Sequence, residues 1–181
     1  MAMAPGGLSM DRRPAWEPEP IPAGAAMTAP SPTPSSTDTS DAAGSGEASQ
    51  FDQALARYQG GAAPEDLIDD FLAITSQAPQ LSAGWTCLAW LQLLLDQPRA
   101  ALQSARTAVR LNPQDPQARI NLSLALLETG GKGVREQVEL VQRVMLMAPE
   151  LAEELRGSIA DGLQRRPGWG ALNKLKGWLE D

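Results

Sequence analysis

Pro79 and Pro113 lie 34 residues apart, and this spacing constrains the fold more than any other feature, because each proline closes a similar apolar segment. From Ala48 onward, apolar residues recur three and four positions apart, and Pro, Gly or Asn interrupts the pattern at short intervals. Such spacing is typical of amphipathic helices, and the interruptions are typical of helix ends. A unit of this length predicts a pair of antiparallel helices that is repeated along an all-α chain.

The copy of this unit that ends near Pro113 has the most regular pattern. Its characteristic residues are Trp85, Leu88, Ala89, Ala101, Ala105, Ala108 and Pro113. A large residue on the first helix fills the space beside the second helix, whose alanines let the two backbones approach. This pattern resembles the tetratricopeptide repeat family, although Gln92 stands where that family usually has Tyr. The resemblance implies an α–α superhelix of stacked helical hairpins.

The resemblance further implies a domain of three hairpins followed by capping helices, which shield the last interface of such an array. We expect repeats at about 48–81, 82–115 and 116–151, and capping helices at about 150–165 and 168–180. The outer repeats match the family less well. Leu67 replaces an alanine in the first of them, and Arg119 replaces the large residue in the last.

Residues 1–47 differ from the rest of the chain, since they are rich in Pro, Ala, Gly, Ser and Thr and show no apolar period. A segment of this kind cannot bury enough apolar surface to offset the entropy lost on ordering, so we expect a disordered arm. Its bulky anchor is Trp16, which precedes alternating prolines up to Pro22. This stretch is either a short docking motif or a lone Trp in a solvated tail.

In the tetratricopeptide repeat family, the first helices of successive repeats line a concave face that takes up peptides or helices. The resemblance places the corresponding partner-binding groove at Thr86, Trp90, Leu93, Gln117, Ile120, Asn121, Leu124 and Leu127. Asn121 is either a ligand for the backbone of a bound peptide or a polar residue at the edge of the groove. The segment 85–95 is apolar nearly all round, so something must cover it. The cover is a partner protein, the chain's own C-terminal helix, which carries Trp169 and Trp178, or the N-terminal arm through Trp16.

Composition argues against several classes of function. Acidic residues outnumber basic ones by 22 to 15 and no basic cluster stands out, so nucleic acid is a poor candidate partner. The chain has no His, and its one cysteine, Cys87, lies in an apolar segment, so we expect no metal and no cofactor. The longest apolar run is far shorter than the ~20 residues of a transmembrane helix. With no evident secretory signal, we expect a cytoplasmic protein.

We therefore expect a non-catalytic interaction module, an adaptor or assembly factor that binds a helix or peptide of a partner protein. The alternative is a self-associating scaffold, a homo-oligomer whose groove is filled by its own C-terminal helix. An enzyme is a remote alternative, because the acidic run of Asp66, Asp69 and Asp70 is typical of a solvated helix face.

Overall fold

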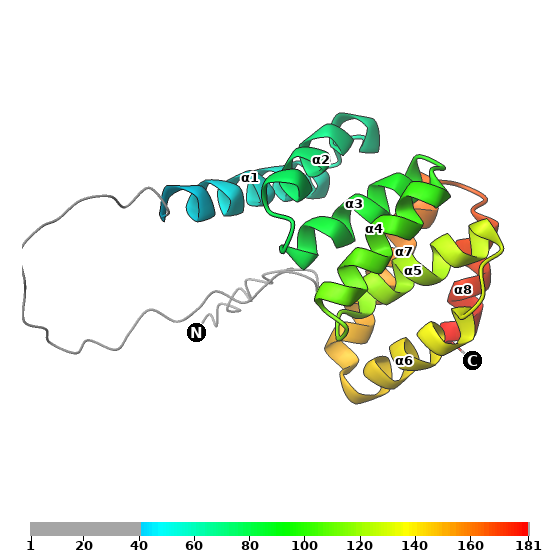
Figure 1. The fold of residues 1–181 in the computed structure, drawn as a ribbon. Helices are drawn as coiled ribbons and strands as arrows, with labels where there is room; N and C mark the ends of the chain where they lie inside the picture. Colours follow the sequence, from blue (N-terminus) through cyan, green and yellow to red (C-terminus); the bar gives the residue numbers. More distant parts are fainter. Residues whose placement is uncertain (1–40, 181) are drawn as a thin grey trace, which may run out of the picture.

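The computed structural model describes residues 41–180, with side chains from residue 50 onward (Figure 1). Most of the expected disordered arm, including Trp16, lies outside the described residues. The first helix begins at Asp41, inside the segment expected to be the end of that arm.

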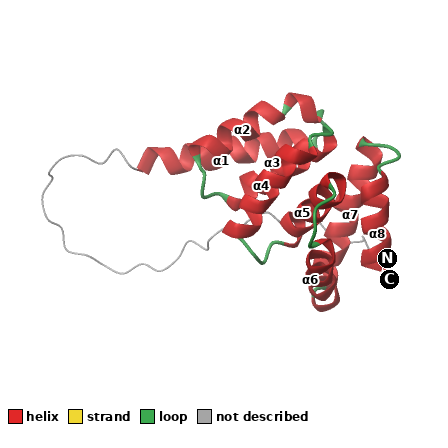
Figure 2. Ribbon diagram, turned by 45° about the vertical axis from the view of Figure 1, so that its right-hand side comes forward, coloured by secondary structure: helices red, strands yellow, loops and turns green. Residues whose placement is uncertain are grey.

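All regular secondary structure in the described range is helical, so the prediction of an all-α chain is confirmed (Figure 2). The elements are α1 (Asp41–Gln59), the 3-10 turn η1 (Pro64–Asp66), α2 (Ile68–Gln77), α3 (Ser82–Leu94), α4 (Pro98–Leu111), α5 (Pro116–Thr129), α6 (Val134–Met147), α7 (Pro149–Arg165) and α8 (Gly170–Glu180). No helix within residues 41–180 is long and apolar enough to cross a membrane.

Proline and glycine mark the helix ends, as their backbone properties require. Pro98, Pro116 and Pro149 each stand in the first turn of a helix, where the missing N–H has no partner to lose. Asp115 caps α5, because its side chain accepts hydrogen bonds from the backbone N–H groups of the next turn at 2.9 and 3.1 Å. Gly130 ends the same helix with a φ of 68°, in the left-handed region that favours glycine.

From α3 to α6 each helix packs against the next, and α3 also lies directly beside α5 (Figure 1). The close approach of α4 to its neighbours depends on small side chains. Ala101, Ala105 and Ala108 are all completely buried on the inner side of α4, while Arg99 and Arg106 are exposed on its other side. The alanines therefore occupy the positions where close helix packing requires them.

The buried side chains form two large clusters that meet at α3. The first cluster joins α1, α2 and α3, and includes Phe51, Phe71 and Leu88. The second joins α3 and α5 to the helices that follow, and it includes Trp90 and Leu124. Because α3 contributes to both clusters, most of its apolar residues are buried, and Trp85 and Leu94 near its ends are partly buried.

Candidate functional site

The eight residues predicted to line a groove lie on α3 and α5, the two neighbouring helices at the centre of the molecule. Four of them, Trp90, Leu93, Ile120 and Leu124, belong to one apolar cluster. Only 7% of Trp90 is exposed, and the other three are at most 1% exposed. The structure thus brings the apolar candidates together, but in the interior.

We call the side of α3 and α5 that carries Trp90, Leu93, Ile120 and Leu124 the inner face. The helices α7 and α8 cover it. Leu155 and Ile159 of α7, Trp169 just before α8 and Leu172 of α8 are buried in the same cluster as these four residues. The indole rings of Trp90 and Trp169 lie with their centroids 5.8 Å apart and their planes tilted by 41°. The inner face of α3 and α5 is therefore occupied by the chain itself rather than open to solvent.

Glycine at position 162 is what lets α7 come so close to the Trp90 side chain of α3. A Cβ atom at Gly162 would lie 2.6 Å from the Trp90 ring and 2.9 Å from the Leu172 side chain, which is inside van der Waals contact. Sequence reasoning missed this residue, because a glycine in the middle of a helix gives no local sign of what packs against it.

The polar candidates, Thr86, Gln117 and Asn121, lie together near the N-terminal ends of α3 and α5. Asn121 is completely buried, and both ends of its side-chain amide are hydrogen-bonded: the NH2 group donates to the Thr86 carbonyl at 2.9 Å and the oxygen accepts from Gln117 at 3.0 Å. The hydroxyl of Thr86 donates to Asp115 at 2.9 Å. The side-chain amide oxygen of Gln117 is buried without a hydrogen-bond partner. Asn121 is therefore not available to a peptide while these bonds are in place.

Burial changes the ionisation of two groups near this polar cluster. It raises the pKa of Asp115, although the backbone N–H groups and the Thr86 hydroxyl oppose the change. It also raises the pKa of the Cys87 thiol well above its usual value, with the charge of Asp115 acting in the same direction. A buried thiol with a raised pKa is a poor nucleophile, so Cys87 acts as a small apolar side chain.

A second polar cluster, which the sequence did not reveal, joins α7 to α1 and α3. The indole N–H of Trp90 donates to the Tyr58 hydroxyl at 2.7 Å, and that hydroxyl donates to Asp161. Arg165 pairs with Asp161 at 2.9 Å and lies 4.2 Å above the Tyr58 ring. Burial, followed by the bond to Asp161, raises the pKa of Tyr58. These contacts join residues 103 apart in the chain, so no short-range pattern predicts them.

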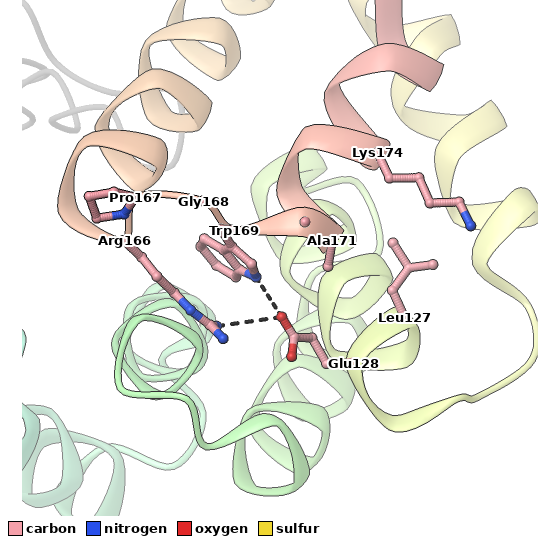
Figure 3. A pocket seen from close by; sticks show the side chains of 9 residues that line it. Leu127, Glu128, Arg166, Pro167, Gly168, Trp169, Ala171 and Lys174 are labelled. Atoms are coloured by element: carbon pink, nitrogen blue, oxygen red, sulfur yellow. Dashed lines mark hydrogen bonds and ion pairs between the residues drawn. The ribbon is translucent and has the colours of Figure 1, made fainter.

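Glu128, at the end of α5, contacts Trp169, which directly precedes α8 (Figure 3). The indole N–H of Trp169 donates to its carboxylate at 2.5 Å, and Arg166 approaches the same oxygen at 3.4 Å. Arg166 also donates to the Leu93 carbonyl at 2.9 Å and pairs with Asp96 at 2.7 Å. These bonds fasten the turn between α7 and α8 to α3 and α5.

An open cleft of about 620 Å³ lies beside this turn (Figure 3). It is lined by Leu127, Glu128, Arg166, Pro167, Gly168, Trp169, Gly170, Ala171 and Lys174. Leu127 is the one predicted groove residue that reaches this cleft, and it is only partly buried. The cleft is thus the place where the occupied inner face meets solvent.

The chemistry of the described residues is that of packing and hydrogen bonding. No group of three or more Cys, Asp or Glu side chains between residues 50 and 180 is arranged to hold a metal ion. Comparison with known proteins returns no family model and no characterised sequence that matches the chain.

Proposed function

We propose that the chain is a non-catalytic protein–protein interaction module of the tetratricopeptide type, an adaptor or assembly factor active in the cytoplasm. Its partner would contribute a helix or peptide that binds on the inner face of α3 and α5. The repeat pattern around Trp85 and Pro113 supports the assignment to this class.

The observation that carries the proposal is the way α8 sits on the inner face. One side of α8, with Leu172 and Leu175, is buried against α5, α6 and α7 in the cluster that also holds Trp90 and Leu124, and its other side is exposed. The surface therefore has the shape and apolarity that suit an amphipathic helix. Fully burying one large apolar side chain contributes about 1.5–3 kcal/mol, so a few such contacts supply a useful binding energy.

Site-specific photo-cross-linking tests the proposal. A photoreactive phenylalanine analogue replaces Leu127, at the rim of the inner face, and in a matched variant replaces Gln103, which is exposed on the outer side of α4. We expect a discrete cross-linked partner from position 127 in native cells and none from position 103. Cross-links from neither position would contradict an interaction function, and cross-links from position 103 alone would move the partner to the outer side.

The second candidate function is a self-associating scaffold. It is favoured by the same occupation of the inner face, because a groove filled by α8 leaves the outer surface to make contacts. Leu146 and Met147 at the end of α6 are 83% and 86% exposed, and large exposed apolar side chains promote association when they cluster. Light scattering over a wide concentration range decides between the two. A mass that stays at 19.2 kDa contradicts the scaffold.

A further inference from the structure

We propose that α8 is a displaceable internal ligand, and that the partner segment is an amphipathic helix of the same kind. That helix carries a Trp at its start and large aliphatic residues three, six and ten positions later. This inference rests on the proposed function and adds the chemistry of the partner and the way in which access to it is controlled.

The apolar side of α8, together with Trp169 directly before it, provides the pattern. Trp169, Leu172, Leu175 and Leu179 are 3%, 0%, 1% and 8% exposed, respectively. They follow one another at spacings that place them on one side of a helix. Between them, Lys176 and Gly177 are exposed. A helix with one apolar side and one polar side matches the surface formed by α5, α6 and α7, with which α8 is in contact.

Glu128 adds a chemical requirement. Its side chain is only 17% exposed, and its closest hydrogen bond is the 2.5 Å bond from the Trp169 indole. If α8 left, Glu128 would keep only the longer contact with Arg166, at 3.4 Å. A half-buried carboxylate that loses a donor is destabilised. The incoming helix therefore needs an N–H donor at its first anchor, which Trp supplies and Phe does not.

The turn before α8 allows this helix to leave without α7. Arg166 is held by the Leu93 carbonyl and by Asp96, neither of which belongs to α8. The body of α7 is held separately, through Arg165 and through the contact of Gly162 with Trp90. Beyond Arg166 the chain continues through Pro167 and Gly168 to Trp169 and α8, so a short turn links α8 to α7. Detachment of α8 therefore leaves the wall formed by α7 in place.

Its covalent link to α7 makes α8 a strong competitor of a partner helix for the same surface. A segment joined by a short linker acts at an effective concentration in the millimolar range, so a partner helix must bind more tightly than α8 does or meet a weakened α8. The apparent affinity of the partner is reduced by the small fraction of molecules in which α8 is detached. Weakening α8 should raise that fraction, and the affinity for a helix added in trans should rise with it.

The experiment uses the full chain and a labelled peptide with the sequence of residues 168–181 as the probe. Fluorescence polarisation compares the wild-type chain, the Leu172→Ala chain and the matched control Lys176→Ala, whose side chain points to solvent. We expect Leu172→Ala to bind the peptide at least tenfold more tightly than wild type, and Lys176→Ala to behave as wild type. A peptide with Phe in place of Trp169 should bind Leu172→Ala at least fivefold more weakly.

Equal binding of the peptide to all three chains, with native helicity by circular dichroism, would overturn the inference. If Leu172→Ala does not fold, the chain variant Trp169→Phe takes its place, because it keeps an aromatic ring, although a smaller one, and removes the N–H donor to Glu128. Conversion of the loosened chain to a dimer in light scattering would also overturn the inference, since the occupant would then be a second copy.

The two proposals fail in different ways. Cross-links from position 127 together with no selective peptide binding leave the interaction function standing and remove the role of α8. Selective peptide binding with no cross-linked partner in cells has the opposite meaning: the inner face accepts a helix, and the proposed function is wrong.

Discussion

Gly162 determines at a single position how closely α7 lies against the Trp90 side chain of α3. Its missing side chain leaves room for the Trp90 ring and for Leu172 of α8. Gly157, also in α7, has no atom within contact distance of the place where a Cβ would stand. Of these two glycines in one helix, Gly162 is therefore packed tightly against the core and Gly157 faces open space.

Alanine at these two positions should have opposite effects. Gly162→Ala inserts a methyl group 2.6 Å from the Trp90 ring, so we expect the free energy of unfolding to fall by about 1–3 kcal/mol. Gly157→Ala should raise it by roughly 0.5–1 kcal/mol, because alanine is the better helix former in open space. Urea titrations of the two variants measure both changes. Equal effects would mean that α7 does not pack as described.

Asp115 combines two roles at one position, since it caps α5 and bonds to Thr86 in the interior. Burial raises its pKa above the usual value of 3.8. Between the unfolded and folded pKa values, the folded chain holds a proton that the unfolded chain has lost. The free energy of unfolding should therefore fall as the pH rises through this interval.

The variant Asp115→Asn should lack this pH dependence while keeping the helix cap, because Asn caps helices about as well as Asp. Urea titrations of wild type and variant between pH 3 and 7 test the difference. We expect the stability of wild type, relative to that of the variant, to decline as the pH rises above about 3.8. A constant difference between the two chains would show that Asp115 ionises normally in the folded state.

At the scale of the helical elements, the position of α7 depends on polar contacts near its C-terminal end. The Tyr58 hydroxyl links Trp90 of α3 to Asp161 of α7, and Arg165 reaches back to the Tyr58 carbonyl at 3.1 Å. These bonds are partly buried, so a missing partner is not fully replaced by water. They hold α7 across the inner face, where it supports α8.

Removing the Tyr58 hydroxyl should loosen this junction. Tyr58→Phe leaves the Trp90 N–H without its acceptor and Asp161 without one donor, so we expect the free energy of unfolding to fall by about 1–2 kcal/mol. A suitable control is Thr107→Val, because the Thr107 hydroxyl bonds only to a carbonyl of its own helix. Thermal unfolding by circular dichroism compares the two variants. A loss no larger than that of the control would contradict the junction.

Across the whole molecule, the two apolar clusters share α3. Leu88 and Leu91 belong to the cluster with α1 and α2, whereas Trp90 and Leu93 belong to the cluster with α5, α7 and α8. Because one helix contributes to both, neither cluster can lose its packing without exposing part of α3. The described domain should therefore behave as one cooperative unit.

Two probes of urea unfolding test this cooperativity. Circular dichroism follows all the helices, and tryptophan fluorescence is weighted toward Trp85, Trp90, Trp169 and Trp178 in the described domain. We expect both signals to give one transition with the same midpoint. Separate midpoints would show that the α1–α2 hairpin unfolds apart from the helices that follow it.

The candidate site depends partly on contacts within one helix and partly on contacts between helices that are far apart in the sequence. The resemblance to the tetratricopeptide repeat family, rather than the apolar period, placed Trp90, Ile120 and Leu124 on one face, because the helix that carries Trp90 is apolar nearly all round. It left open whether a partner or the chain itself covers that face. The answer depends on Gly162, Tyr58 and Glu128, whose contacts lie on other helices.

The amino-acid sequence by itself determined that the described chain is helical and where most of its helices begin and end. Prolines at 98, 116 and 149, the Asp115 cap and the apolar period act within a few residues, so they can be recognised without a fold. Only the tertiary structure decided that α7 and α8 occupy the inner face. That outcome depends on complementary shapes and on bonds between residues as much as 103 positions apart, which a local pattern does not encode.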